Sequence, residues 1–127
     1  MGFYDGMDIA ASGLTAERLR MDTTAQNLAN AQTPGYRRRS VVFQEVLEGA
    51  QAKGVQASAI VDDATPNRRV HDPGNPAADA QGYLSMPNVT PVTEMVDLID
   101  SSRGYEANVN AMQSIKQMLQ RTFEVLK

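Results

Sequence analysis

Few residues of this chain have the types and spacing that could carry out chemistry. His71 is its only histidine, and Asp72 follows it directly in a segment rich in proline and glycine. A histidine beside an aspartate has the groups of a general base and its supporting carboxylate. Adjacent residues in a turn rarely orient each other in this way, and no nucleophile can be matched to them. We therefore interpret His71 as a loop residue and expect no enzyme, with a hydrolase that uses an aspartate or His71 as the remaining alternative.

Metal and cofactor sites are also not indicated. Asp62 and Asp63 are paired carboxylates that could bind a hard cation, but a solvated loop is the preferred interpretation. The chain has no cysteine, which excludes disulfides, thiolate nucleophiles and cysteine-ligated metals. It also lacks a glycine-rich loop of the kind that cradles phosphate. We expect no metal, no cofactor and no small-molecule substrate.

The sharpest charge cluster is the run Arg37-Arg38-Arg39. The chain as a whole carries 12 basic and 15 acidic residues, a net charge of −3. This balance gives no overall attraction to nucleic acid or to anionic lipid, so we expect no nucleic-acid partner. The cluster is interpreted either as a surface that meets an acidic patch on a neighbouring subunit or as a solvated face.

The elements that would position these residues begin with a long N-terminal helix. Apolar or small residues recur there in steps of four and three, as in a helix packed nearly parallel to another helix. They are Met7, Ala11, Leu14, Met21, Ala25 and Leu28, with Arg18 as the one interruption. Gly13 lies inside the helix and either allows close backbone approach or is a tolerated flaw. The helix is predicted to end near Asn30, because Thr33-Pro34-Gly35 is a turn signal.

A second, longer helix is predicted at the C-terminal end. Thr90 resembles a helix N-cap, and Pro91 suits the first helical position. The apolar repeat that follows extends over about 35 residues, or roughly 50 Å. Its members are Met95, Leu98, Ser102, Tyr105, Val109, Met112, Ile115, Leu119, Phe123 and Leu126. Gly104 is again an interior glycine, and Asn108 either fixes the register of a helix pair or is exposed.

The middle of the chain, residues 37–90, lacks helical periodicity. The alternation of apolar residues from Val55 to Val61 predicts a strand, and Tyr83–Met86 is a second candidate. Residues 72–76, Asp-Pro-Gly-Asn-Pro, form a turn or loop. A short β-hairpin or an irregular knob, with at most four strands, is the expected structure.

The predicted fold class is mainly α, with two terminal helices that pair like a coiled coil and a small β or irregular middle part. Aromatic residues make up only 6% of the chain, so a lone helix pair would be marginally stable in water. Lateral packing against other subunits would complete the burial, which favours an assembly subunit over a catalyst. The residues predicted to lie in subunit interfaces are Leu14, Met21, Leu28, Leu98, Tyr105, Val109, Met112, Leu119, Phe123 and Leu126.

The sequence contains no apolar run long enough, at about 18 residues, to predict a membrane-spanning helix. Its first residues have neither a basic nor an apolar signal segment, so no cleaved secretory signal is expected. Export would need a route that does not depend on one.

Three segments carry a resemblance to a known family. Residues 9–14, Ile-Ala-Ala-Ser-Gly-Leu, and residues 27–36 resemble the N-terminal signature of bacterial flagellar rod and hook proteins. The second segment contains the motif residues Asn27, Asn30, Thr33, Pro34, Gly35 and Tyr36. Residues 105–108, Tyr-Glu-Ala-Asn, resemble the matching C-terminal end. Residues 72–76, 82–83 and 86–89, together with the short length, resemble the proximal-rod members.

The resemblance implies a structural subunit of the basal-body proximal rod. Such proteins are exported unfolded by the flagellar type III apparatus and polymerise in the periplasm into a helical drive shaft. The implied partners are copies of the chain, other rod proteins, the membrane-ring adaptor protein and the type III export gate. The helices, residues 1–36 and 91–127, would form an inner coiled-coil domain and residues 37–90 an outer one. Free subunits would have poorly ordered termini.

Substrates of this export route carry a phenylalanine followed four residues later by an apolar residue, a pattern that Phe43 and Leu47 fit. On one helical turn these two side chains would share a face and could enter an apolar groove of the export gate. The alternative is a structural contact in the rod. For the chain as a whole, the alternative function is a soluble helical adaptor or export chaperone of the flagellar system.

Overall fold

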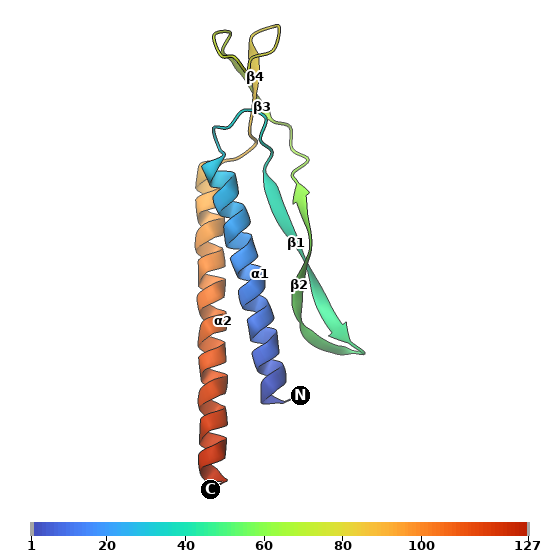
Figure 1. Cartoon of the computed structure of the whole chain (residues 1–127), viewed down its shortest axis with the longest axis vertical. Helices are drawn as coiled ribbons and strands as arrows, with labels where there is room; N and C mark the ends of the chain where they lie inside the picture. Colours follow the sequence, from blue (N-terminus) through green and yellow to red (C-terminus); the bar gives the residue numbers. More distant parts are fainter. Residues whose placement is uncertain (1, 127) are drawn as a thin grey trace.

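The computed structural model describes residues 2–126. Within this range the chain forms two long helices and two separate two-stranded antiparallel sheets (Figure 1). The helices are α1 (Phe3–Ala29) and α2 (Pro91–Val125). The strands are β1 (Arg39–Glu48), β2 (Gln51–Asp62), β3 (Arg68–His71) and β4 (Tyr83–Met86). The predicted fold class, paired terminal helices with a small β middle part, is confirmed.

Helix α1 ends, and helix α2 begins, where local sequence signals predict. Asn30 is the C-cap of α1, and its side-chain amide donates to the carbonyl oxygen of Gln26 at 2.8 Å. Gly35 follows with a φ of +82°, which glycine adopts readily. Thr90 is the N-cap of α2 and Pro91 its first residue, although Thr90 caps the helix without a side-chain hydrogen bond.

The two helices are antiparallel and meet along a seam of polar and small residues. Asn27 lies against Glu94, Arg20 against Ser101, Gly13 against Asn108 and Gly6 against Ile115. Each step of seven residues back along α1 is therefore matched by a step of seven forward along α2, as in a coiled coil. The sequence predicted a seam of mainly apolar residues. Glu94 and Ser101, directly in the seam, are buried, whereas Met95 and Ser102 of the predicted stripe are exposed.

Strands β1 and β2 form a long hairpin that lies along α1 (Figure 1), with pairing from Arg39–Asp62 to Glu48–Gln51. The hydroxyl oxygen of Ser12 in α1 accepts a hydrogen bond from the backbone N–H of Val55 at 3.1 Å. Gly54 lies directly over Ser12, where a Cβ would overlap the hydroxyl. Helix α1 is thus placed between α2 on one side and the hairpin on the other.

In the folded chain Phe43 and Leu47 do not share a helical turn, because both belong to strand β1. Their recognition by the export gate stays a prediction. Register shifts occur between Val42 and Phe43 and between Val46 and Leu47. The extra residue at each shift, Ser58 or Lys53, lies in β2, so the pairing residues of β1 follow one another without a gap. Phe43 is half-buried and Leu47 is 58% exposed. A short apolar run without clear periodicity does not distinguish a strand from a helix, which explains why the sequence did not predict this strand.

The hydrophobic core is small for a chain of this size. Its buried apolar residues are Ala10, Ala16, Ala31, Leu84, Met86 and Val89. Four of the six lie near the point where the helices, the hairpin and strand β4 converge: Ala31, Leu84, Met86 and Val89. Within the described residues, no helix is both long and apolar enough to span a membrane.

Candidate functional site

The most completely bonded site of the molecule is a polar joint where α1, β1 and α2 meet. Asn27, in the last turns of α1, is 1% exposed. Its amide nitrogen donates to the carbonyl oxygen of Arg39 at 2.7 Å and to Glu94 Oε2 at 3.4 Å. Its amide oxygen accepts from the Arg39 N–H and the Tyr36 hydroxyl, both at 2.9 Å. One side chain therefore fixes the start of the hairpin against both helices.

Arg38 supplies the positive charge of this joint. Its side chain pairs with the fully buried carboxylate of Glu94, with Asp97 at 3.3 Å and with Asp63 at 3.4 Å. Burial alone would lower the pKa of Arg38, but the hydrogen bond and the charge of Glu94 raise it above the ordinary value. A carboxylate buried away from water is tolerated only with such partners. Arg38 therefore stays charged and holds α2 against the start of the hairpin.

The other motif residues make the turn that brings Tyr36 and Arg38 to the joint. Thr33 donates its hydroxyl to Asn30 Oδ1 at 3.2 Å, and the Tyr36 N–H donates to the Thr33 carbonyl at 3.2 Å. The Gly35 N–H donates to the Ser85 carbonyl at 2.8 Å, which ties the turn to strand β4. Pro34 between them is exposed. Burial raises the pKa of the Tyr36 phenol, so the hydroxyl remains a donor to Asn27.

The structure also shows how the arginine run is used. Arg37 donates to the carbonyl oxygen of Asp63 at 2.8 Å, and Arg39 pairs with Asp62 at 3.6 Å. With Arg38 bound to three carboxylates, all three cations bind groups of this same chain. From the sequence, we expected these arginines to meet either an acidic patch of a neighbouring subunit or solvent. The sequence did not predict that they bind groups of their own chain. The charge run is part of the internal joint.

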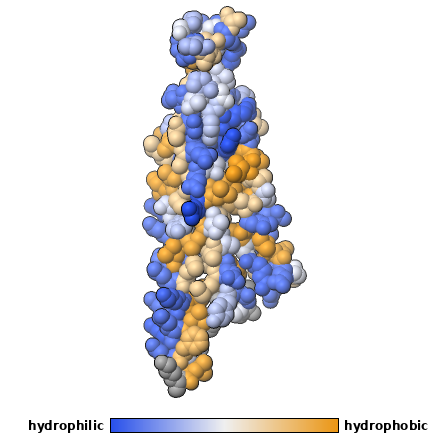
Figure 2. Space-filling model, viewed as in Figure 1, coloured by the Kyte–Doolittle hydropathy of each residue, from blue (hydrophilic) through white to orange (hydrophobic). Residues whose placement is uncertain are grey.

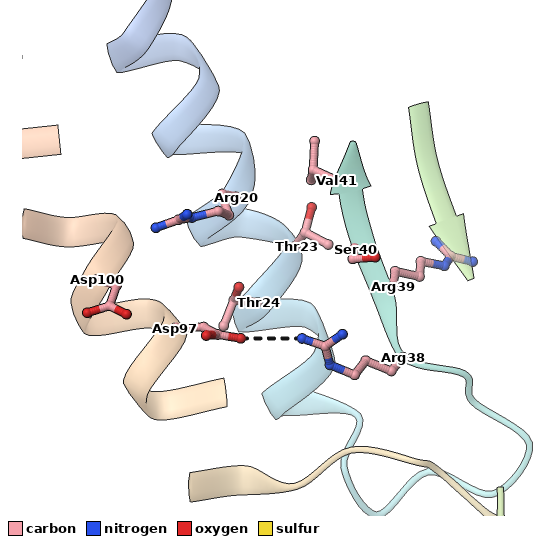
Figure 3. A pocket seen from close by; sticks show the side chains of 9 residues that line it. All are labelled: Arg20, Thr23, Thr24, Arg38, Arg39, Ser40, Val41, Asp97 and Asp100. Atoms are coloured by element: carbon pink, nitrogen blue, oxygen red, sulfur yellow. Dashed lines mark hydrogen bonds and ion pairs between the residues drawn. The ribbon is translucent and has the colours of Figure 1, made fainter. Parts of the chain in front are cut away.

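A cleft of about 190 Å³ opens beside the joint, between α1, β1 and α2 (Figure 3). It is lined by Arg20, Thr23, Thr24, Arg38, Arg39, Ser40, Val41, Asp97 and Asp100. Figure 3 marks the ion pair between Arg38 and Asp97, two of the lining residues, with a dashed line. The polar groups around it are tied to one another and to the backbone. Thr23 donates to the Leu19 carbonyl, and Arg20 donates to Ser101.

His71 and Asp72 do not form a base and its support. The imidazole packs edge-on against the ring of Tyr83 at 4.9 Å between centroids, and Arg69 lies 4.6 Å over the same ring. This small cluster stabilises the β3–β4 hairpin. Across the described residues, no group of three or more histidine, aspartate or glutamate side chains is arranged to hold a metal ion.

The residues predicted for subunit interfaces lie on both helices and none is fully buried in the isolated chain. Phe123 is 58% and Leu126 is 76% exposed. The others are half-buried: Leu14, Met21, Leu28, Leu98, Tyr105, Val109, Met112 and Leu119. Large apolar side chains that a chain leaves in contact with water are available to a partner. Their role in subunit contacts stays a prediction.

Comparison with known proteins decides the family. Residues 7–37 match the family described as flagella basal body rod protein, and residues 80–125 match the C-terminal family of the flagellar basal body rod FlgEFG proteins. The chain is 41% identical to the flagellar basal-body rod protein FlgC of Escherichia coli O6:H1, over 96% of each chain. The chain belongs to the FlgC family of flagellar basal-body rod proteins. FlgC of Bacillus subtilis is 39% identical over 100% of both chains, and FlgC of Aquifex aeolicus is 40% identical over 100% of this chain and 99% of its own.

Two features of this FlgC-family chain were not predicted from its sequence. Glu94 and Arg38 were not recognised as partners, because they are 56 positions apart and belong to different predicted elements. The polar repeat Glu94, Ser101, Asn108 was hidden beside the apolar stripe. Its spacing of seven residues was the one signal that could have revealed it.

Proposed function

We propose that the chain is a structural subunit of the flagellar basal-body rod, where it polymerises with copies of itself and with other rod proteins in the periplasm. The observation that carries this proposal is the full-length likeness to FlgC proteins from distant bacteria, at 39–41% identity. The matched segments include both terminal helices and the motif at the joint. As a structural subunit it has no need of a catalytic site.

The packing of the isolated chain supports an assembling role. The helices contact each other through glycine, asparagine, serine and charged groups. Many of their large apolar residues remain half-exposed, and fully burying one such side chain contributes about 1.5–3 kcal/mol. Contacts with neighbouring subunits along the helices would recover that free energy. The polar joint would meanwhile keep the hairpin at one fixed orientation in every subunit.

Three finer assignments are part of the proposal. The chain is exported by the flagellar type III apparatus, with Phe43 and Leu47 recognised by the export gate while the chain is unfolded. It contacts the membrane-ring adaptor protein at the base of the rod. Residues 1–36 and 91–127 form the inner part of the rod wall, and residues 37–90 form the outer part.

The test is mass spectrometry of purified basal bodies from which hooks and filaments have been removed. Wild-type cells are compared with a strain lacking this chain and with the same strain complemented. We expect the protein in wild-type basal bodies and an arrest before rod completion in the deletion strain. If complete rods form without the chain while it stays in the cytoplasm, an adaptor or export chaperone is the function instead.

A further inference from the structure

Helix α2 carries two apolar patches that its own chain does not cover. The first, called here the N-terminal patch, consists of Val92, Met95, Val96 and Ile99, which are 70%, 51%, 51% and 53% exposed. The second, the C-terminal patch, consists of Leu119, Phe123 and Leu126, of which the last two are 58% and 76% exposed. In Figure 2 hydrophobic residues follow the lower part of α2, beyond the start of α1.

The two patches lie on opposite sides of the helix. Residues of the N-terminal patch are three, four and seven positions apart and so share one face. Ile99 is two positions from Ser101, which faces α1, so this patch points away from α1. Leu119 and Phe123 lie one and two turns beyond Ile115, which faces Gly6 of α1. The C-terminal patch therefore continues the seam past the start of α1.

Each patch is confined to one end of α2. Beyond Ile99 toward the C-terminus, the face of α2 that points away from α1 is polar. Its residues are Arg103, Glu106, Asn110 and Gln113. Because of this confinement, two copies can overlap through these patches only at the ends of their α2 helices.

Charges at the rims of the patches are complementary. Asp100 follows Val96 by one turn at the edge of the N-terminal patch, and it is exposed. Lys116 precedes Leu119 by three residues at the edge of the C-terminal patch, and it is also exposed. Opposite charges at the rim of an apolar contact favour one orientation of the partner and disfavour the others.

We infer that the C-terminal patch of one copy of this chain packs on the N-terminal patch of a second copy, with Lys116 of the first near Asp100 of the second. This inference rests on the proposed function. A contact between two different patches at opposite ends and on opposite sides of α2 is heterologous and does not close into a two-fold dimer. It continues from copy to copy, as a rod requires.

The absence of cysteine from the sequence makes crosslinking a clean test. Ile99→Cys and Phe123→Cys are produced separately, with different tags, and then together in a strain that lacks the natural chain. Cells are oxidised, basal bodies are purified, and crosslinked species are identified by immunoblotting and mass spectrometry. Gln113→Cys, on the same outward face as Ile99 but outside the patch, is the matched control paired with Phe123→Cys.

We expect a disulfide dimer when Ile99→Cys and Phe123→Cys are present together, and about tenfold less of it with either variant alone or with the control pair. Asp100→Lys should lower the crosslinked fraction by about tenfold, and Lys116→Asp in the partner copy should restore it. Circular dichroism of the purified variants verifies that each still folds.

Three outcomes would overturn the inference. The variants could enter basal bodies without an Ile99–Phe123 crosslink above the control. Each variant could crosslink to itself as readily as to the other, which indicates a two-fold contact. Mass spectrometry could identify a different rod protein as the partner of Phe123→Cys. In all three the chain is in the rod and the proposed function stands, whereas absence of the chain from basal bodies overturns both.

Discussion

Gly13 of α1 is packed directly against the side-chain amide of Asn108 in α2. A Cβ at Gly13 would lie 2.8 Å from both the oxygen and the nitrogen of that amide. The amide is held in place by a 3.0 Å hydrogen bond from its nitrogen to the Gly104 carbonyl. Gly104 is in turn packed against Glu17 of α1, and a Cβ added at Gly104 would lie 2.8 Å from Glu17 Oε1. The interior glycines are therefore required by the helix seam.

Gly13→Ala is expected to destabilise the helix pair. The higher helix propensity of alanine would raise the free energy of unfolding by about 1 kcal/mol. Overpacking against Asn108 would lower it by about 1–3 kcal/mol. Urea unfolding followed by circular dichroism should show a lower midpoint for Gly13→Ala, and Gly13→Ala with Asn108→Ala should recover most of the loss. Ser102→Ala, on an exposed position of α2, is the control. A higher midpoint for Gly13→Ala alone would contradict close packing at this position.

Arg38→Ala is expected to destabilise the chain more than Glu94→Gln does. Removing the arginine leaves a fully buried carboxylate with only the Asn27 amide beside it, a loss of about 3–5 kcal/mol. Neutralising Glu94 leaves Arg38 paired with Asp63 and Asp97, so its effect is smaller. Both are measured by urea unfolding, with Arg68→Ala in the exposed strand β3 as the control. Equal effects of the two variants would show that burial of the carboxylate does not decide the stability of the joint.

Alkaline pH should loosen the joint through Tyr36. Burial raises the pKa of this phenol above its ordinary value of 10.0, so the folded chain keeps the proton that the unfolded chain releases. The stabilisation is complete below pH 10 and is lost as the pH rises through the folded-state value. As the pH rises above about 10, the urea midpoint of the wild type should fall more steeply than that of Tyr36→Phe. Parallel curves would show that another group accounts for any alkaline loss.

Gly54→Ala is expected to detach the hairpin from α1. The glycine has a φ of +134°, which L side chains rarely adopt, and a Cβ there would overlap Ser12 Oγ. The backbone strain alone is of the order of 1–3 kcal/mol. Loss of the contact should be visible as faster amide exchange at Val55, whose N–H is bonded to Ser12. Gly74→Ala, at a position with an ordinary φ in a loop, is the control, and unchanged exchange at Val55 would refute the packing role of Gly54.

Leu47→Ala separates export from packing. Leu47 is 58% exposed, so truncation should change the free energy of unfolding by less than about 0.5 kcal/mol. If the export gate recognises Phe43 and Leu47 in the unfolded chain, Leu47→Ala still lowers the amount of protein secreted. Phe43→Ala, at a half-buried position, should lower both. Normal secretion of Leu47→Ala would remove this residue from the export assignment.

The end of α1, the start of α2 and strand β2 were predictable from sequence, because their signals are local. Thr90-Pro91 and Thr33-Pro34-Gly35 act through the backbone geometry of their own turns, and the alternation from Val55 to Val61 marks strand β2. The seam was not predictable in the same way. An apolar stripe shows that a helix has a buried side, but it does not show which residue of the partner helix faces each position. The sequence therefore left two interpretations open for Gly13 and two for Asn108.

The polar joint depends on contacts between distant parts of the chain. Asn27 and Tyr36 were identified through a family resemblance. Such a resemblance marks positions in the sequence but does not show which groups their side chains bind. Their bonds to Arg39, and the pairing of Arg38 with Glu94, depend on how three elements converge in space. Strand β1 was not predicted because its apolar residues stand next to one another, in Val41–Phe43 and Val46–Leu47, instead of alternating with polar residues.

The seven-residue pairing of the two helices also sets an order in which they can close. At the joint, Asn27 and Glu94 are 67 positions apart in the chain, and at Arg20 and Ser101 the separation is already 81. Each later pair must close a longer loop, and the entropy lost grows with loop length. The helices therefore pair first at the joint and last at their free ends. They separate in the opposite order, beginning at the free ends. The last pairs to form lie beside the C-terminal patch, so the end of α2 opens first and a neighbouring subunit can reach it without unlocking the joint.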